Sequence, residues 1–536
     1  MSAKPKVYVV GVGMTKFEKP GKRDWDYPDM VKEAVTKALD DCGLKYSDVQ
    51  QATVGYLFGG TCCGQRSLYE LGFTGIPIYN INNACASGSS GVYLCKQIIE
   101  SGNADVVLAC GFERMAAGSL ENMNANIDDR AVPVDKHIEV MANTFGLHPA
   151  PITAQMFVNA GLEHMKKYGT KREHFAKIAY KNHLHSVHNE NSQFQKKFTL
   201  DEVMNARKIY DFMGLLECSP TSDGSAAAII CSENYLKKNP RLRSQAVEIV
   251  GIELGTDLPS VFKEDNIKMI GYDMIEKIAK DLYRKTGLTP NDVQVIELHD
   301  CFAPNELITY EALGLCPPGK AGELIDRGDN TYGGKWVINP SGGLISKGHP
   351  IGATGVAQVV ELSNQLRGRC GKRQVPNCKV AMQHNIGIGG AGVVAFYRLA
   401  DGGSATGPRV GLSSSGGGSL ASDAVFAEIN ERVKTEKELV KKAGQLVARF
   451  IVNGKDGSSK NWLVDLKRTP PFVGQDENTK AEIEATLSDE TFMNLAAGKI
   501  KPDQAFMKGQ LKVKGNIAKA MKLQTILNPS MLKLKL

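Results

Sequence analysis

The sequence predicts an α/β protein over residues 1–400, followed by a smaller α+β module. Three observations support this division. Short apolar strand candidates alternate with helical patterns up to residue 400, the same region repeats itself, and the stretch DGGSATGPRVGLSSSGGGS at 401–419 has too few apolar side chains to join a core. We therefore expect a flexible linker at 401–420 and a separate module at 421–536.

The strand candidates of the first part are short and mostly apolar, as buried strands in α/β proteins are. They lie at 7–13, 106–112, 247–254, 293–300 and 379–385. In the second part, strands are expected at 445–453 and 461–468, and one or two amphipathic helices at 425–444. Ser488 is placed to cap a helix that Gly498 ends, and a final helix is expected at 516–527.

The first 400 residues contain two copies of one unit. GLKYSDVQ at 43–50 recurs as GLTPNDVQ at 287–294, and GSSGV at 88–92 recurs as GATGV at 352–356. The second match, carried back three positions, aligns Cys85 with His349. If the halves pack about a pseudo-twofold axis, this thiol and this imidazole converge. We expect halves at 1–245 and 246–400, with a loop insertion at about 118–215.

Cys85 lies in INNACASGSSGVYL, between a strand candidate and a helix. A helix N-terminus favours the thiolate, which is the nucleophilic form of cysteine. His349 lies in the glycine-rich run NPSGGLISKGHPIGATG, where an imidazole could accept the thiol proton and later stabilise an oxyanion. The two residues together predict nucleophilic catalysis.

Two further loops carry candidate residues. The strand candidate at 293–300 ends in His299 and Asp300 and is followed by Cys301, a thiol suited to proton transfer near neutral pH. The run HNIGIGGAG at 384–392 offers backbone N–H groups for an oxyanion hole, and it does not fit the GxGxxG pattern of a dinucleotide site.

Composition excludes several classes of protein. The net charge of +7 comes without a Lys/Arg block, so nucleic acid is not an expected partner. No apolar run reaches the 18 or so residues of a transmembrane helix. The 12 cysteines show neither a disulfide framework nor zinc spacing, and no signal peptide is expected, so we predict a reducing compartment and no metal site.

With these residues in view, the first 400 residues resemble the thiolase family, and the whole chain resembles the sterol carrier protein X family, in which a 3-ketoacyl-CoA thiolase is fused to a sterol carrier protein 2 domain. Four loops match in order: NNACASGS, HDCF, the GHP loop and HNIGIGG. Common thiolases have NEAF in place of HDCF and a CxG cysteine where this chain has Asn385. This departure is typical of the sterol carrier protein type.

The resemblance implies a duplicated thiolase fold and assigns roles to the candidate residues. Cys85 takes the acyl group, His349 activates it, and Cys301 shuttles the proton. The enolate oxygen is held by His349 and a water near His299, and the thioester oxygen by the N–H groups of Cys85 and Gly387, with Gly389 as the alternative register. Asn385 is a supporting residue.

The implied reaction is degradative cleavage of long-chain or branched 3-ketoacyl-CoA in peroxisomal β-oxidation, with coenzyme A as co-substrate and no tightly bound cofactor. Three alternatives stay open. They are a ketoacyl-synthase-like condensing enzyme, which His299 and His384 keep in view, a biosynthetic acetyl-CoA acetyltransferase, and a lipid-transfer protein with an inert thiolase part. The residues that contact CoA are not identified from sequence.

The second part resembles the sterol carrier protein 2 family over GKIKPDQAFMKGQLKVKGNIAKAMKL. That resemblance implies an α+β domain with an apolar tunnel for lipids, sterols and acyl-CoA. The resemblance of the first 400 residues to thiolases implies a homodimer through the thiolase part. The chain ends in Leu534, Lys535 and Leu536, which resembles a peroxisomal address except at Leu534. We expect peroxisomal import through a receptor, with a cytoplasmic or mitochondrial location as the alternative.

Overall fold

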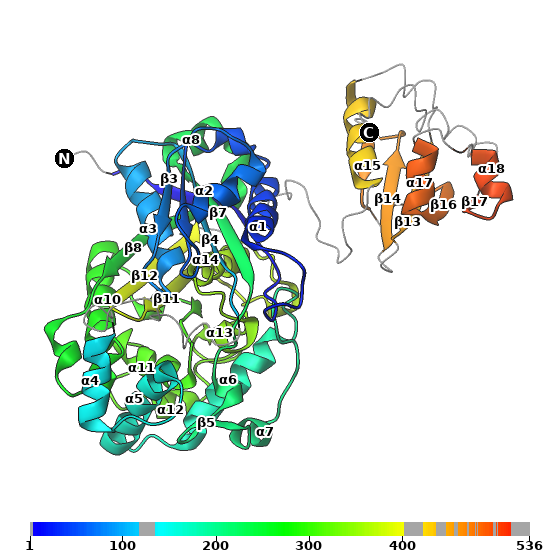
Figure 1. The fold of residues 1–536 in the computed structure, drawn as a ribbon. Helices are drawn as coiled ribbons and strands as arrows, with labels where there is room; N and C mark the ends of the chain where they lie inside the picture. The colour runs from blue at the N-terminus through cyan, green and yellow to red at the C-terminus, as the bar shows by residue number, and fades with distance from the viewer. Residues whose placement is uncertain are drawn as a thin grey trace. The chain divides into compact units, whose positions relative to one another are not determined.

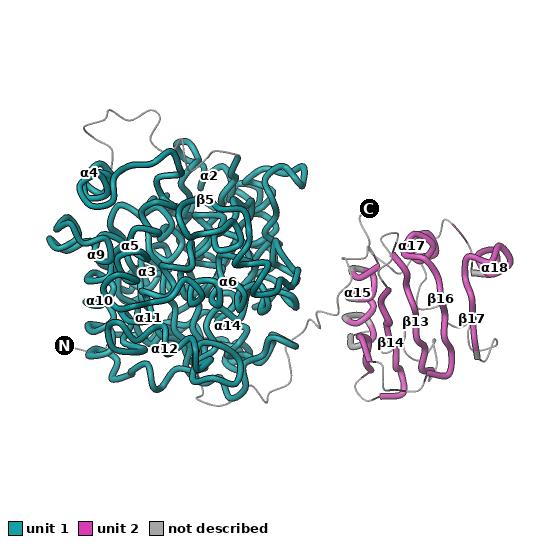
Figure 2. The backbone as a smooth tube through the Cα atoms, turned by 90° about the horizontal axis from the view of Figure 1, so that it is seen from below, with its two compact units in different colours: residues 1–410 teal, residues 411–536 magenta. Residues whose placement is uncertain are grey.

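The computed structural model divides into two compact units, residues 1–410 and 411–536, which are described separately (Figure 2). The residues whose structure is described are 4–116, 134–400, 422–435, 446–454, 459–468, 471–476, 479, 481–496, 500 and 502–515. The predicted linker, the final helix at 516–527 and the C-terminal tripeptide therefore lie outside the described residues, as does Gly498.

Ten strands of the first unit form one hydrogen-bonded sheet. They are β1 (Val7–Met14), β2 (Gln51–Gly55), β3 (Ile78–Ile81), β4 (Val106–Glu113), β7 (Gly224–Ser232), β8 (Val247–Gly255), β9 (Val295–Glu297), β10 (Val337–Ile338), β11 (Val380–Gly387) and β12 (Ala391–Leu399). All five strand candidates of this unit are confirmed, although the one at 293–300 is shorter than expected because its last residues leave the sheet to enter the HDCF loop.

The strand order shows the duplication directly. It reads β10-β9-β11-β12-β8 in the second half and β1-β7-β4-β2-β3 in the first, and β1 pairs with β8 where the halves meet. In each half the first two neighbouring pairs from this junction are antiparallel and the next two are parallel. The two halves are therefore copies of one topology, as the repeated motifs predicted.

The repeated motifs also have the same local structure. Helices α1 (Tyr27–Cys42) and α10 (Tyr272–Thr286) both end at a glycine in the left-handed region, Gly43 with φ 62° and Gly287 with φ 70°. A single turn of 3-10 helix follows each glycine and leads into β2 or β9. Glycine adopts this φ without the steric cost of a Cβ, so GLKYSDVQ and GLTPNDVQ are equivalent helix stops.

Alternate residues of each strand face different cores, as the period of a strand requires. Val7 and Val9 of β1 pack with α3 (Ser87–Glu100) and α14 (Thr354–Leu366), whereas Tyr8 and Val10 pack with α1. Strand β12 divides in the same way between the α3/α14 core and a core that contains α10. The unit is thus layered, with α3 and α14 in the central layer and α1 and α10 outside.

The helices α3 and α14 approach each other closely through glycines. A Cβ on Gly88 would lie 2.7 Å from the carbonyl oxygen of Gly352, and a Cβ on Gly111 of β4 would lie 2.1 Å from the same oxygen. Real Cβ atoms are not found at such distances, so glycine is required at both positions. GSSGV and GATGV therefore mark the contact between the two halves.

The described residues of the segment between β4 and β7 include four α-helices, which Figure 1 shows together at one end of the first unit. They are α4 (Asp135–Thr144), α5 (Ile152–Tyr168), α6 (Arg172–Ser186) and α7 (Leu200–Met204). The short strands β5 (Lys208–Tyr210) and β6 (Met213–Gly214) follow. Helix α6 packs against α11 (Ala303–Ala312) and α13 (Gly343–Lys347), so this segment supports the loops of the second half that carry candidate residues.

The remaining helices of the first unit are short. They are α2 (Cys63–Leu68), α8 (Glu233–Lys238), α9 (Asn266–Met269) and α12 (Ala321–Asp326). Among the residues that the structure describes, no helix combines the length and the apolar character needed to cross a membrane.

The second unit is a five-stranded sheet with helices, in strand order β15-β14-β13-β16-β17. Its described elements are α15 (Ser422–Thr435), β13 (Val447–Asn453), β14 (Ser459–Asp465), β15 (Phe472–Gly474), β16 (Ile483–Ser488), α17 (Asp489–Ala496), α18 (Pro502–Met507) and β17 (Leu511–Gly515). The two expected strands pair antiparallel, and Ser488 Oγ accepts the N–H of Thr491 as a helix cap. Phe426 stacks on Trp462 and Phe492 in the core. The α+β prediction is confirmed.

The glycine contact between the halves gives a stability prediction. In Gly111→Ala, the new methyl group would overlap the Gly352 carbonyl, and overpacking of this kind costs about 1–3 kcal/mol. We expect the melting temperature of the variant to fall in a thermal denaturation experiment. Gly60→Ala is the control, because a Cβ there meets no atom within 4 Å. Equal melting temperatures for the two variants would contradict the contact.

Candidate active site

Cys85 lies in a tight turn between β3 and α3. Ala84 has a φ of 47°, which is strained for a residue with a side chain. The turn is held by Ser87, whose Oγ accepts the N–H of Asn83 and donates to the Ala84 carbonyl. Cys85 is 9% exposed, so a substrate can reach it only in a shielded site.

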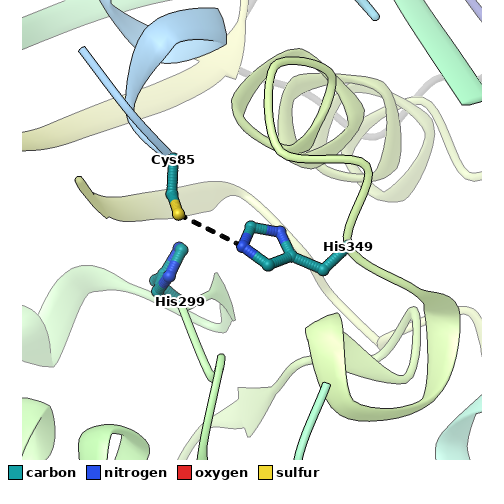
Figure 3. Close-up of side chains that lie close together, drawn as sticks. All are labelled: Cys85, His299 and His349. Atoms are coloured by element: carbon teal, nitrogen blue, oxygen red, sulfur yellow. Dashed lines mark hydrogen bonds between the residues drawn. The ribbon is translucent and has the colours of Figure 1, made fainter. Parts of the chain in front are cut away.

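His349 meets Cys85 across the two halves. It follows α13 and Gly348, whose φ of 114° turns the chain, and its N–H donates to Ser222 Oγ at 3.0 Å. Its Nε2 lies 3.3 Å from Cys85 Sγ. Figure 3 shows the two side chains pointing toward each other across this contact. The internal repeat predicted this convergence, because the two residues occupy equivalent positions in the two copies.

Thr354 fixes the tautomer of His349. The Thr354 hydroxyl donates to the Pro350 carbonyl at 3.1 Å and lies 2.6 Å from His349 Nδ1. Since the hydroxyl proton is used by the carbonyl, Thr354 Oγ1 accepts from Nδ1–H. In a neutral imidazole the other nitrogen is then unprotonated, so Nε2 is free to accept the thiol proton of Cys85. Thr354 was not among the residues singled out from sequence.

Both members of the pair are neutral at rest. Burial raises the pKa of Cys85 to about 12, aided by the charge of Glu113, and burial lowers the pKa of His349 to about 3. Nearby N–H groups lower the pKa of Cys85, as a helix N-terminus does, but the cost of desolvation exceeds their effect, so the neutral thiol is favoured. Thiolate forms when His349 removes the proton.

His299 completes a cluster with this pair. Its ring stands edge-on to that of His349, with 5.2 Å between centroids. One ligand atom from each of Cys85, His299 and His349 lies within 4.8 Å of the others. Cys and His are also zinc ligands, so the tautomer of His299 decides whether this cluster suits a metal ion or a hydrogen-bonded substrate. Asn385 Nδ2 lies 2.8 Å from His299 Nδ1.

Cys301 is buried beside this cluster but is not part of it. It is 6% exposed, and its carbonyl accepts the N–H of Ser219 at 2.9 Å. Burial raises its pKa well above the usual value, and the Cys85 thiolate, when it forms, raises it further. The structure therefore places the second thiol within electrostatic range of the first. Its assignment as acid and base stays a prediction.

Gly387 lies against the Cys85 turn. A Cβ at this position would be 2.1 Å from the Asn83 carbonyl oxygen and 3.1 Å from the Ala86 nitrogen, so only glycine allows this approach. The N–H groups that lower the pKa of the Cys85 thiol are its own and that of Ile388. Ile388 is therefore a backbone donor that sequence analysis missed, between the two glycines considered there.

Glu113 ties the loops of the two halves together. Its carboxylate accepts the N–H groups of Leu57 and Phe58 from the first half and that of Gly352 from the second. Burial raises its pKa to about 7 although these three donors favour the charged form. Glu113 thus holds the loop after His349 at a set distance from Cys85. Its position at the end of β4, where strands of an α/β sheet carry functional residues, was the available sequence signal.

Comparison with family models divides the chain in the same way. Residues 7–234 match the thiolase N-terminal domain, residues 263–396 match the thiolase C-terminal domain-like family, and residues 426–528 match the SCP-2 sterol transfer family.

The chain is also similar to curated proteins over nearly its whole length. It is 54% identical to the sterol carrier protein 2 of Gallus gallus over 536 residues, 99% of this chain and 97% of that protein. The human sterol carrier protein 2 is 53% identical over 530 residues, 97% of this chain and 96% of that protein. A Caenorhabditis elegans protein, non-specific lipid-transfer protein-like 2, is 79% identical over 398 residues, 74% of this chain and 97% of that protein.

Solved structures share the fold of the first unit at low identity. Human mitochondrial 3-ketoacyl-CoA thiolase matches with a TM-score of 0.55 and 21% identity, over 74% of this chain and 99% of that one. The Ltp2-ChsH2(DUF35) aldolase matches with a TM-score of 0.61 and 22% identity, over the same shares. The near-complete match to the sterol carrier protein 2 relatives goes further than fold: this chain belongs to the family of thiolase-type acyltransferases that carry a C-terminal sterol carrier protein 2 domain.

Proposed function

We propose that the first unit is a degradative 3-ketoacyl-CoA thiolase that acts on long-chain or branched substrates with coenzyme A as co-substrate. The observation that carries this proposal is the 3.3 Å contact between Cys85 Sγ and His349 Nε2, made by a neutral thiol and an imidazole whose tautomer is set to accept the proton. A nucleophile paired with an oriented base is the arrangement that covalent acyl transfer needs.

In the first half-reaction, His349 takes the Cys85 proton while the sulfur attacks the 3-keto carbon of the substrate. The bond between C2 and C3 then breaks, which leaves the shortened acyl group on Cys85 and the enolate of acetyl-CoA or propionyl-CoA. Cys301 protonates that enolate at C2. The N–H groups of Cys85 and of residues 387–389 stabilise the oxyanion at the former keto carbon.

In the second half-reaction, free coenzyme A replaces the first product. Cys301, now a thiolate, takes the thiol proton of CoA, and the CoA sulfur attacks the acyl group on Cys85. The new acyl-CoA leaves, and the Cys85 thiolate recovers its proton from His349. Both thiols and the imidazole return to their starting states, so the cycle balances without a further cofactor.

Other reactions on this fold remain testable alternatives. A condensing enzyme of the ketoacyl synthase class and the aldolase with the same fold share the scaffold, and fold alone does not fix the reaction. The presence of Cys301 beside Cys85 favours the thiolase, because a second thiol serves the proton transfer at C2. A biosynthetic acetyltransferase is separated by its preference for acetoacetyl-CoA, and an inert transfer protein by lipid binding without thiolysis.

The role of the second unit, the boundaries of the parts, the oligomeric state and the location of the protein are also proposed. The second unit is proposed to bind lipids, sterols or acyl-CoA, and the boundaries 1–245, 246–400, 401–420 and 421–536 are proposed as those of the working parts. Homodimerisation through the first unit is proposed from its membership of the thiolase-type family. Import into peroxisomes by a receptor is proposed from Lys535 and Leu536.

The roles of the two cysteines can be separated by experiment. We expect Cys85→Ala to abolish CoA-dependent cleavage of short, long and 2-methyl-branched 3-ketoacyl-CoA, and to take no acyl group from a saturated acyl-CoA. Cys301→Ala should also lose cleavage but should still be acylated at Cys85, at a reduced rate, because acylation needs no proton at C2 and the CoA thiolate can leave without taking a proton from Cys301. Cleavage is followed by loss of the 3-ketoacyl-CoA absorbance, and acylation by the mass of the intact protein.

Cys378→Ala, which removes a thiol in the loop before β11, is the control and should behave as wild type. Unchanged thiolysis in Cys301→Ala would overturn its role, and failure of wild type to cleave any of the three substrates would overturn the proposed function.

Thr354 gives a second prediction. Thr354→Val keeps the shape of the side chain but removes the acceptor of His349 Nδ1–H, so the imidazole can take the unproductive tautomer. We expect kcat to fall about 10- to 100-fold, the range over which partners that orient a histidine act. Thr354→Ser restores the hydroxyl and should restore most of kcat. A valine variant with wild-type kcat would show that the hydroxyl does not set the tautomer.

A further inference from the structure

The side-chain amide of Gln383 begins a chain of buried hydrogen bonds in which the donor and the acceptor of each bond can be assigned. Gln383 lies in β11 and its side-chain nitrogen donates to the Gly355 carbonyl at 2.7 Å. A backbone carbonyl can only accept, so this contact fixes which end of the amide is nitrogen. The Tyr397 hydroxyl meets Gln383 Oε1 at 2.6 Å, which agrees with that orientation.

Ser89 connects Gln383 to Asn385 across the boundary between the halves. It lies in α3 of the first half, and its Oγ is 3.0 Å from Gln383 Nε2 and 2.8 Å from Asn385 Oδ1. The Gln383 nitrogen has no lone pair to accept the serine proton, so the hydroxyl donates to Asn385 Oδ1. Ser89, Gln383 and Asn385 are each fully buried, and bulk water cannot exchange with these partners.

Asn385 connects Ser89 to His299 and determines which nitrogen of His299 carries the proton. Because Oδ1 accepts from Ser89, the amide nitrogen is the atom that lies 2.8 Å from His299 Nδ1. An NH₂ group can only donate, so Nδ1 is the unprotonated nitrogen. Burial lowers the pKa of His299 well below its usual value, and the neutral ring therefore carries its proton on Nε2. Within the described residues, no side chain or backbone group is bonded to that Nε2.

We propose that Ser89 and Gln383 are positioning residues that hold His299 as an Nε2–H donor for the substrate oxygen. His299 and His349 are thereby kept in opposite tautomers, one as a donor and the other, through Thr354, as the base. This inference rests on the proposed thiolase function for the identity of the oxygen, which is the thioester oxygen that becomes an enolate. The tautomer of His299 is inferred without that function, from the hydrogen bonds and the burial of the ring.

The chain of hydrogen bonds from Gln383 through Ser89 and Asn385 to His299, here called the relay, also bears on metal binding. It explains why the cluster of Cys85, His299 and His349 does not suit a metal ion. A metal ligand needs the lone pair of the imidazole nitrogen that faces it, and zinc-binding histidines usually donate their other N–H to an oxygen acceptor. Here Asn385 presents a donor to Nδ1, so the proton stays on Nε2 and blocks that lone pair. The same atoms with a carboxylate at position 385 would form a metal site.

A kinetic comparison tests the relay in the working enzyme. Ser89→Ala leaves Asn385 Oδ1 without its donor. The Asn385 side-chain amide can then rotate so that Oδ1 and Nδ2 exchange places, and His299 can change its tautomer. We expect kcat to fall about tenfold with KM changed less than about twofold, because the lost hydrogen bond strengthens in the transition state. Ser363→Ala is the matched control, since it removes a buried serine hydroxyl that has no hydrogen-bond partner. Equal kcat for the two variants, or a change in KM alone, would overturn the proposal.

A metal titration tests the tautomer without using activity. Asn385→Asp places a carboxylate against Nδ1, which favours Nδ1–H and frees the Nε2 lone pair, whereas Asn385→Ala removes the donor without adding an acceptor. With Co²⁺ as the probe and thiolate-to-cobalt absorption as the readout at pH 8, we expect the aspartate variant to bind about tenfold more tightly than the alanine variant, and wild type to bind most weakly.

Co²⁺ affinity in the aspartate variant no higher than in wild type would show that Asn385 does not set the tautomer. The titration needs no substrate. A protein that lacks thiolysis but follows this order of affinities would therefore disprove the proposed function and leave the relay standing.

Discussion

The close approach of α3 and α14 is the contact on which the active site depends. The helices meet at glycine backbone, where a carbonyl of the second half lies too near Gly88 and Gly111 for any side chain. Each helix begins just after a candidate catalytic residue, Cys85 or His349, so the spacing of the helices sets the spacing of the two reacting atoms. The carboxylate of Glu113 accepts hydrogen bonds from loops of both halves and thereby also helps to fix the distance between Cys85 and His349.

The reacting residues of the site are buried. Burial carries a desolvation cost for Cys85 and His349, which their hydrogen-bond partners offset. Desolvation makes Cys85 a poor acid and His349 a poor base when each is considered separately. Neutral partners at 3.3 Å avoid a buried ion pair at rest, and charge appears only when substrate occupies the site. The directed hydrogen bonds of Thr354 and Asn385 then matter more than any fixed charge, since they decide which imidazole nitrogen accepts and which donates.

The sequence predicted the parts of this picture that depend on pattern. Apolar runs identify the strands, the repeated motifs identify two copies of one topology, and the register of those motifs pairs Cys85 with His349. The protonation of Cys85 could not be predicted, because a helix N-terminus is visible in a sequence while the depth of burial is not. Thr354, Ser89, Gln383 and Ile388 were missed for a related reason. Their importance lies in the direction of individual hydrogen bonds, and serine, threonine and glutamine at such positions look like ordinary helix and strand residues.

The pseudo-twofold arrangement has a consequence for how such a site can arise. If a single unit paired with an identical copy of itself, equivalent positions on the two sides of the axis would carry the same residue, either two thiols or two imidazoles. Joining both units in one chain removes that restriction, because each copy can then change independently. The asymmetry of nucleophile and base at Cys85 and His349 is thus available to a duplicated chain and unavailable to a symmetric pair of single units.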